Sequence, residues 1–358
     1  MKKIIFPILI VLSVTLYGQT DKEKAFDLGM RAIEEMENGH IDAAIKLLEQ
    51  SKKLDPENIS YPYEIAYAKF LNKEYNEAIK ILKGIKKHPQ ANDLVYQMLG
   101  NCHDMIKKPK KAIAIYEEGL KLFPNSGKLY LERGNMEFMS ENYNSALEYY
   151  EKGLEVDPDF PSNYYWSAFI FLNSSEEVWG MIYGEIFLNL EPDTKRTSEI
   201  SKLIYDTYKN QIQFTSDSSY SVSFCQNATI DIGEISDVKN IKLPYGLSIY
   251  EPTLMLSMVN ENTIEISSLN RIRTNFLKLY FDKGFDKTYP NILFDFQKQV
   301  SDAGHIEAYN YWILMNGEPD AFKEWKDSNN EKWEQFVAWF KDNRLQIDDS
   351  NKFFRTQY

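Results

Sequence analysis

Hydrophobic residues recur at helical spacing between residues 25 and 194, and Pro interrupts them at regular intervals. The pairs Asp55-Pro56, His88-Pro89, Phe123-Pro124, Asp157-Pro158 and Glu191-Pro192 follow one another after 33, 35, 34 and 34 residues. Pro ends a helix because it cannot donate to the helical ladder and because it restricts the residue before it. The spacing therefore predicts five units of about 34 residues.

Small residues occupy two fixed positions in these units, which span 25–58, 59–92, 93–126, 127–160 and 161–194. The eighth residue is Ala32, Ala66, Gly100, Gly134 or Ala168, and the twentieth is Ala44, Ala78, Ala112, Ala146 or Gly180. Only small side chains let two helix backbones approach closely. Each unit is therefore predicted to be two antiparallel helices, and stacked units share one continuous core.

These columns resemble the tetratricopeptide repeat. The fourth unit fits best, and the fifth departs most, with Gly180 and Gly184 where helix-favouring residues are expected. The resemblance implies a mostly α-helical solenoid of five helix pairs over residues 25–194. Residues 196–210 are predicted to be its capping helix, which completes the solenoid at 25–210. The apolar stripe of that helix is Ile200, Leu203, Ile204 and Tyr208.

The repeat phase is lost after residue 210. Tyr220, Val222 and Phe224 alternate with Ser and Cys, which favours short strands in 211–250, and an ordered linker is the alternative. Residues 251–358 return to helical spacing and predict an aromatic-rich, mainly helical C-terminal domain of no recognised family. Its four Trp residues favour core packing over a platform that stacks on sugars; they are Trp312, Trp325, Trp333 and Trp339.

The first residues have the layout of a secretory signal peptide, with Lys2 and Lys3 before an apolar run from Ile4 to Val14. The run is shorter than the roughly 20 residues of a spanning helix. Cleavage before Gln19 would remove 1–18 and leave 19–24 as a short lead. A buried N-terminal helix or a membrane anchor is the alternative. The chain is therefore expected to be exported to the periplasm or cell envelope, and its order of segments resembles envelope proteins of Gram-negative bacteria.

Composition narrows the classes of function. The 358 residues carry 41 Lys and Arg against 53 Asp and Glu, and a net charge of −12 does not suit a nucleic-acid partner. Two Cys and four His, widely scattered, predict no metal site, and no cofactor or catalytic motif is present. Cys102 and Cys225 are expected to be buried free thiols rather than a bridge. His103 is expected in the interior, and His305 at a helix end rather than paired with Glu307.

The resemblance implies that residues two, five, nine and twelve of each unit line the concave face of the solenoid. This groove is expected to bind a peptide, with Asn101 and Asn135 pairing its backbone, or else to hold the chain's own C-terminal half. The fifth residues, Gly29, Tyr63, Gln97, Leu131 and Tyr165, lack the Lys or Arg of a carboxylate clamp. The candidate groove residues are Tyr63, Tyr67, Phe70, Gln97, Asn101, Asp104, Asn135, Phe138, Tyr165 and Phe169, with Phe26 and Ile33 beside them.

The sequence thus favours an exported, non-catalytic scaffold that binds a protein or peptide segment in its groove. Two alternatives stay open: an enzyme, or a carbohydrate-binding protein, with its site in residues 211–358 and the repeats recruiting the substrate. Buried Trp side chains would favour the scaffold, an exposed coplanar row would favour the carbohydrate binder, and a deep pocket with converging carboxylates would favour the enzyme.

Overall fold

The computed structural model describes residues 20–216, 219–226 and 244–358 of the protein. The predicted signal peptide lies outside these residues. Packing divides the chain into two compact units, one ending at Ile115 and the other beginning at Tyr116, within helix α6 (Pro109–Leu122). The expected boundary lay after residue 210. The division falls earlier because the C-terminal helices share one hydrophobic core with the fourth and fifth helix pairs.

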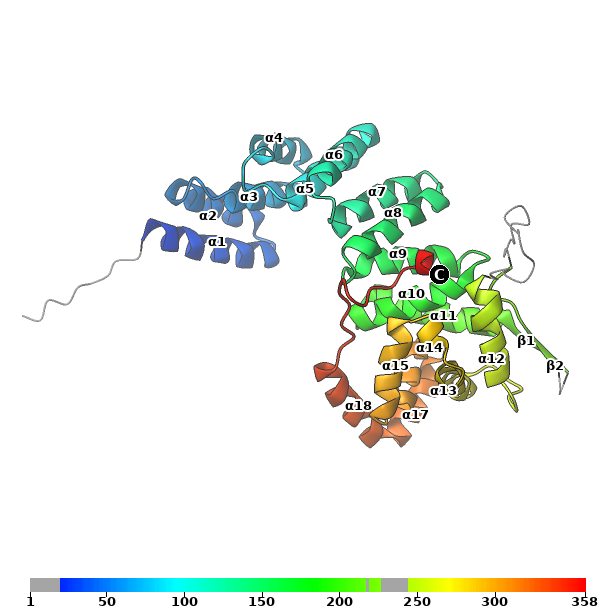
Figure 1. Ribbon diagram of the computed structural model, residues 1–358. Coiled ribbons are helices and arrows are strands. Elements are labelled where there is room, and N and C mark those ends of the chain that lie inside the picture. The colour runs from blue at the N-terminus through cyan, green and yellow to red at the C-terminus, as the bar shows by residue number, and fades with distance from the viewer. Residues whose placement is uncertain (1–19, 217–218, 227–243) are drawn as a thin grey trace, which may run out of the picture. The chain divides into compact units, whose positions relative to one another are not determined.

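The N-terminal unit contains α1 (Asp21–Glu37), α2 (Ile41–Leu54), α3 (Ser60–Leu71), α4 (Tyr75–Ile85), α5 (Asp93–Met105) and the start of α6. Thr20 begins α1 with a capping box, in which its hydroxyl accepts from the Glu23 amide and the Glu23 carboxylate accepts from the Thr20 amide. In Figure 1 the helices of this unit follow one another from α1, in blue, to the start of α6, in cyan.

A residue with left-handed backbone closes the turn inside each of the first four helix pairs. Gly39, Lys73, Lys107 and Glu141 have φ angles of 80°, 63°, 57° and 62°. They recur every 34 residues, so the tight turn repeats with the helices. These turns separate the two antiparallel helices that were predicted for each unit.

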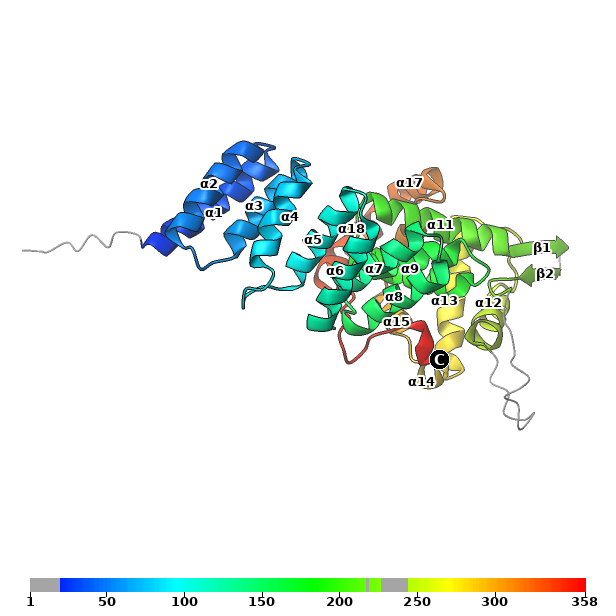
Figure 2. The same ribbon diagram turned by 90° about the horizontal axis from the view of Figure 1, so that it is seen from above.

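The C-terminal unit continues the pairs with the rest of α6 and with α7 (Gly127–Met139), α8 (Tyr143–Val156), α9 (Pro161–Leu172) and α10 (Glu177–Leu190). Helix α11 (Lys195–Gln211) follows where the capping helix was predicted. Strands β1 (Ile212–Ser216) and β2 (Ser219–Val222) form an antiparallel hairpin with Phe214 opposite Tyr220, and they lie side by side in both views (Figures 1 and 2).

The remaining elements of this unit are helical. A π-helical turn, η3 (Gly246–Tyr250), leads into α12 (Glu251–Ser257), α13 (Ile266–Asp282), α14 (Phe285–Thr288), α15 (Ile292–Asp302), α16 (Ile306–Leu314), α17 (Pro319–Ser328) and α18 (Asn330–Asp342), and a 3-10 turn, η4 (Arg355–Gln357), comes last. The predicted fold class, repeated helix pairs followed by an aromatic-rich helical module with short strands, is confirmed.

Helix α10 is buried on all sides, since every residue from Glu177 to Asn189 is shielded from solvent. The two glycines that depart from the repeat pattern explain part of this packing. A Cβ atom on Gly180 would lie 2.7 Å from the Leu172 amide nitrogen of α9, and one on Gly184 would lie 3.0 Å from the Ile200 side chain of α11. Both glycines therefore let neighbouring helices approach α10 closely.

Both cysteines are free and buried, as expected. Burial raises the pKa of the Cys102 thiol to about 12. Across the three described segments of the chain, the helices are all too short or too polar to cross a membrane.

Candidate functional site

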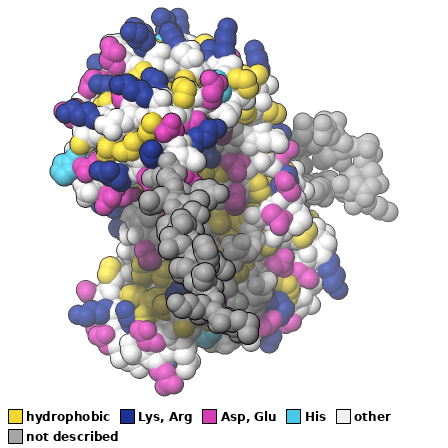
Figure 3. Space-filling model, turned by 90° about the vertical axis from the view of Figure 1, so that its left-hand side faces the viewer, with side chains coloured by type: hydrophobic (Ala, Val, Ile, Leu, Met, Phe, Trp, Pro, Cys, Tyr) yellow, Lys and Arg dark blue, Asp and Glu magenta, His cyan; other side chains and the backbone are white. Residues whose placement is uncertain are grey.

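Large apolar side chains are exposed on the first helices of the N-terminal unit. Phe26, Met30 and Ile33 on α1 are 62%, 51% and 37% exposed. Tyr67 and Leu71 on α3 are 37% and 42% exposed, and Met105 on α5 is 51% exposed. Figure 3 shows hydrophobic side chains, in yellow, at the surface of this unit among the charged ones. We call the surface formed by repeat positions 2, 5, 6, 9, 12 and 13 of α1, α3 and α5 the first-helix face.

The predicted groove residues of the N-terminal unit all lie on this face. Tyr67 is exposed, and five others are half-buried: Tyr63, Phe70, Gln97, Asn101 and Asp104. The Phe70 ring packs edge-on against Tyr75, with ring centroids 5.4 Å apart. Burial, followed by the charge of Glu64, raises the pKa of Tyr63 to about 12. Burial also raises the pKa of Glu64 itself. This part of the face is therefore only partly hydrated.

The outer side of α1 differs from that of the helices that follow it. Repeat positions 3, 7 and 10 are the buried residues Tyr61, Ile65 and Ala68 in α3, but they are Asp27, Arg31 and Glu34, all exposed, in α1. A charged outer side suits the first helix of an array, because it offers no apolar surface to a preceding repeat. The exposed apolar residues of α1 therefore belong to the first-helix face and not to an unfinished stacking surface.

A hollow of about 480 Å³ adjoins the first-helix face at the start of α3 and α5. Tyr63, Glu64 and Leu94 line both the hollow and the face. The charged side chains around the hollow are Asp55, Glu57, Glu64 and Lys22, so acidic groups outnumber basic ones.

The predicted groove residues of the C-terminal unit are held by their own surroundings. Tyr165 is only 7% exposed, and its hydroxyl donates to the Glu199 carboxylate of α11 over 2.6 Å. Phe138, Trp166 and Phe169 are half-buried and pack ring against ring, with centroids 4.9 Å apart for Phe138 and Trp166 and 6.3 Å apart for Phe138 and Phe169. These rings are largely occupied by contacts within their own unit.

Asn135 was expected to pair with the backbone of a bound peptide, but its side chain already has hydrogen-bond partners within the protein. Its side-chain oxygen accepts a hydrogen bond from the Tyr150 hydroxyl at 2.9 Å, and its amide nitrogen donates to Glu132 at 3.2 Å. The amide is satisfied within its own helix pair, because Gly134 beside it lets Tyr150 approach: a Cβ atom on Gly134 would lie 2.3 Å from the Tyr150 ring.

Sequence reasoning missed three of the most exposed residues of the first-helix face, Met30, Leu71 and Met105. A signal for two of them was present. The thirteenth residue of three successive units is Leu71, Met105 and Met139, and each of these is exposed. This column was not assigned to the groove, because periodicity does not distinguish an outward apolar column from an inward one.

Residues 94–126 and 127–160 match the family model of the tetratricopeptide repeat. The chain contains tetratricopeptide repeats. Comparison with curated proteins gives no match.

Solved structures resemble up to about half of the chain at low sequence identity. TTC0263, a tetratricopeptide protein of Thermus thermophilus, is 16% identical over 50% of this chain and 98% of its own, with a TM-score of 0.43. YrrB, described as having an unusual peptide-binding site, is 16% identical over 48% of this chain and 89% of its own, with a TM-score of 0.33. The first repeat domain of Spaghetti, bound to an HSP90 peptide, is 23% identical over 34% and 98%, with a TM-score of 0.31.

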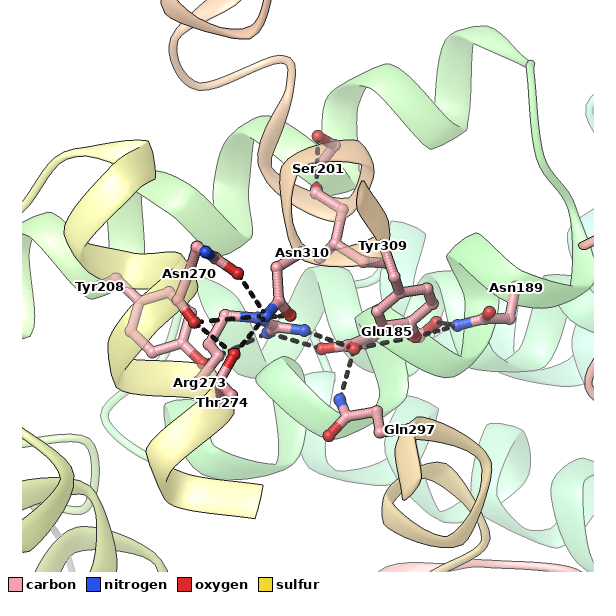
Figure 4. Close-up of polar contacts among 11 residues, drawn as sticks. Glu185, Asn189, Ser201, Tyr208, Asn270, Arg273, Thr274, Gln297, Tyr309 and Asn310 are labelled. Carbon is pink, nitrogen blue, oxygen red and sulfur yellow. Dashed lines mark hydrogen bonds and ion pairs between the residues drawn. The ribbon is translucent and has the colours of Figure 1, made fainter. Parts of the chain in front are cut away.

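A buried polar cluster joins the last tetratricopeptide unit to the C-terminal helices. Glu185 of α10 forms an ion pair with Arg273 of α13, with N–O distances of 2.6 and 2.8 Å, and their side chains are 4% and 7% exposed. Gln297 of α15 and Tyr309 of α16 also donate to the Glu185 carboxylate. Figure 4 shows these side chains converging on Glu185 from the different helices. The Asn310 side-chain oxygen accepts from Arg273, so both charges are well satisfied. The cluster is therefore a docking contact between helices.

The last residues form a strap across the second helices of the tetratricopeptide array. Arg355 pairs with Glu151 of α8 through two bonds of 2.9 and 2.8 Å, and its amide donates to the Tyr183 hydroxyl of α10. Phe353 is buried against Trp179 and Tyr183. In this unit the C-terminal half thus covers the second helices, whereas the alternative of self-docking placed it in the groove lined by first helices.

The Trp residues of the C-terminal helices are part of the core. Trp312 and Trp325 are buried, and Trp333 and Trp339 are half-buried against the same cluster. Trp325 stacks on Tyr311 at 4.3 Å, and Trp312 packs tilted against Phe340 at 4.9 Å. They do not form the exposed coplanar row that a sugar platform needs.

His103 and His305 lie where they were expected. His305 precedes α16 as its N-cap residue and packs against Trp339, while Glu307 accepts from Trp325 and Lys332. His103 is 5% exposed, and burial, together with Lys83, Lys111 and Lys108, lowers its pKa. Its Nδ1 lacks a hydrogen-bond partner among the described residues, so it is an interior His that is only partly satisfied.

Proposed function

We propose that this protein is an exported, non-catalytic interaction protein whose tetratricopeptide array binds a segment of a partner protein on the first-helix face. The observation that carries the proposal is the exposure of six large apolar side chains there: Phe26, Met30, Ile33, Tyr67, Leu71 and Met105. Contiguous exposed apolar surface on a folded protein marks a site of interaction.

Two further features support the same assignment. The outer side of α1 is charged, with Asp27, Arg31 and Glu34. Another repeat would not stack on this charged side, so such stacking does not explain the neighbouring apolar residues. Half-buried polar residues of the face can orient a bound chain; they are Tyr63, Gln97, Asn101 and Asp104. In this proposal the C-terminal helices stabilise the end of the array and carry no chemistry. Export rests on the pattern of residues 1–18 alone, and it places the partner in the periplasm or cell envelope.

Site-specific photo-crosslinking tests this function. A photoreactive amino acid is placed at Leu71 on the first-helix face or, as a matched control, at the exposed Lys80 on the second helix α4. We expect the same discrete protein adducts in cell-envelope extract from Leu71 and from a second probe at Met30, and none from Lys80. Equal adducts from Lys80, or none from either face position, would contradict the proposal.

A further inference from the structure

The arrangement of apolar residues on the first-helix face favours a helical occupant. Phe26, Met30 and Ile33 follow the i, i+4, i+7 spacing, so they form one row along α1. Tyr67 and Leu71 form a parallel row along α3 by the same i, i+4 spacing. Two parallel rows on neighbouring helices form ridges with a groove between them, and the apolar stripe of another helix fits such a groove.

Four methionines extend this apolar surface. Met30 and Met36 on α1 and Met98 and Met105 on α5 occupy positions of the first-helix face, and Met30 and Met105 are exposed. Met side chains are unbranched and polarizable, and surfaces rich in them adapt to differently shaped apolar partners. The face therefore selects an apolar stripe without demanding one particular side-chain shape.

The charged residues of the face all have one sign. Glu37, Glu64 and Asp104 are the charged side chains at positions 2, 5, 6, 9, 12 and 13 of α1, α3 and α5. Residues 20–115 carry 16 Lys and Arg against 15 Asp and Glu, and none of those basic residues occupies one of these positions. The unit is nearly neutral as a whole, so the acidic character belongs to this face. The adjoining hollow is acidic as well, since its charged lining residues are three carboxylates and Lys22.

Building on the function proposed above, we infer that the occupant is a cationic amphipathic helix of the partner protein. Its apolar stripe would cover Met30, Ile33, Tyr67 and Leu71, while Lys or Arg residues beside that stripe would face Glu64 and Asp104. The apolar contact supplies most of the affinity, and the carboxylates select basic flanks over acidic ones by electrostatic complementarity.

Two synthetic helical peptides of the same length and the same Leu stripe, one with Lys flanks and one with Glu flanks, test this inference. Fluorescence anisotropy with the purified protein should show the Lys peptide binding at least about tenfold more tightly. The preference should shrink as salt rises from about 0.05 M to about 0.5 M, because exposed charges are screened. Equal affinity for both peptides would overturn the charge selection while leaving the proposed interaction function intact.

Matched variants separate this face from general attraction to an acidic protein. Glu64→Gln with Asp104→Asn should weaken the Lys peptide about tenfold, whereas Asp327→Asn with Glu334→Gln, exposed carboxylates of α17 and α18, should change its affinity by less than about twofold. Leu71→Asp should weaken both peptides. If both double variants lose affinity equally, the Lys peptide binds nonspecifically and the inference is wrong. If neither peptide binds and Leu71 also yields no adducts in the crosslinking experiment, the proposed function falls with it.

Discussion

The first three helix pairs and the fifth pair share one 34-residue spacing, yet they differ in how much of their surface is exposed to solvent. In α2 the buried Ala44 and Leu48 alternate with the exposed Lys46, Lys52 and Lys53, and the first helices leave apolar residues in water. In α10 every residue from Glu177 to Asn189 is buried. The repeat columns determine how the two helices of a pair cross, whereas the outward positions determine what can pack on each pair.

The C-terminal helices explain the difference. They cover the second helix of the fifth pair and join it through Glu185 and Arg273, so this end of the array is a folding scaffold. The first-helix face of the N-terminal unit instead leaves its large apolar side chains exposed to solvent. The predictions below test this contrast, and they use a convenient difference in composition. All six Trp residues lie after residue 116, so Trp fluorescence follows unfolding of the C-terminal unit and circular dichroism follows both units.

The largest expected effect comes from breaking the buried ion pair. Arg273→Met leaves the Glu185 carboxylate buried without its counter-charge, and we expect the free energy of unfolding of the C-terminal unit to fall by about 3–5 kcal/mol. Denaturant titration monitored by Trp fluorescence measures this. Arg271→Met, which removes a pair between the exposed Arg271 and the less exposed Glu261, should cost less, on the order of 1 kcal/mol. Adding Glu185→Leu to Arg273→Met should recover much of the loss, and a double variant as unstable as the single one would contradict the docking role.

Burial of Glu177 at the start of α10 predicts a pH dependence. Burial raises the pKa of this carboxyl from 4.5 to about 7, although the Gln211 amide donates to it. Between these values the unfolded chain ionises Glu177 first and binds fewer protons than the folded chain, so stability falls as pH rises. Glu177→Gln should therefore stabilise the C-terminal unit by about 2 kcal/mol at pH 8 and hardly at all at pH 4. The exposed Glu148→Gln is the control, and equal slopes of stability against pH in both variants would exclude the effect.

How far the sequence predicts this molecule depends on the distance between interacting residues. The turn at 38–40 and the helix at Lys195–Gln211 follow from local periodicity, capping and turn chemistry. The burial of α10 could also be predicted, since a helix that is apolar on all sides must be covered by other elements. The elements that cover α10 could not be predicted, because Glu185 and Arg273 are 88 residues apart and the sequence around either residue does not identify its partner.

The repeat positions predicted where the candidate groove residues lie on their helices, but they predicted the exposure of these residues only in part. Tyr67 lies on the open first-helix face as expected, whereas Tyr165 at the corresponding face of the fifth pair is covered by Arg196 and Glu199 of α11. Asn135 was assigned to a ligand because its own partner, Tyr150, lies on the facing helix of the same pair. A repeat position thus indicates where a side chain points, and the neighbouring residues decide what it meets.

Glycine substitutions compare the two regions directly. Gly180→Ala places a Cβ atom 2.7 Å from the Leu172 amide nitrogen, so we expect a loss of about 1–3 kcal/mol in the C-terminal unit. Gly134→Leu should cost at least as much, because the Tyr150 ring already fills the space beside Gly134. Gly84→Ala in α4 meets no atom within 4 Å and should stabilise the N-terminal unit by up to about 1 kcal/mol. Melting curves by circular dichroism measure all three, and a destabilising Gly84→Ala would show that α4 is more tightly packed than described.

Substitutions of Asn135 and Asn101 separate a structural amide from a ligand-binding one. Asn135→Ala removes the acceptor of the buried Tyr150 hydroxyl, so the free energy of unfolding should fall by about 1–2 kcal/mol, while binding on the first-helix face of the N-terminal unit should not change. Adding Tyr150→Phe to Asn135→Ala should restore most of that stability, because both partners of the hydrogen bond are then gone. Asn101→Ala should instead reduce crosslinking from Leu71, since Asn101 is a half-buried residue of the first-helix face. If Asn135→Ala left stability unchanged but abolished the adducts, Asn135 would be a ligand contact after all, and the division between an open N-terminal face and a self-contained C-terminal one would be wrong.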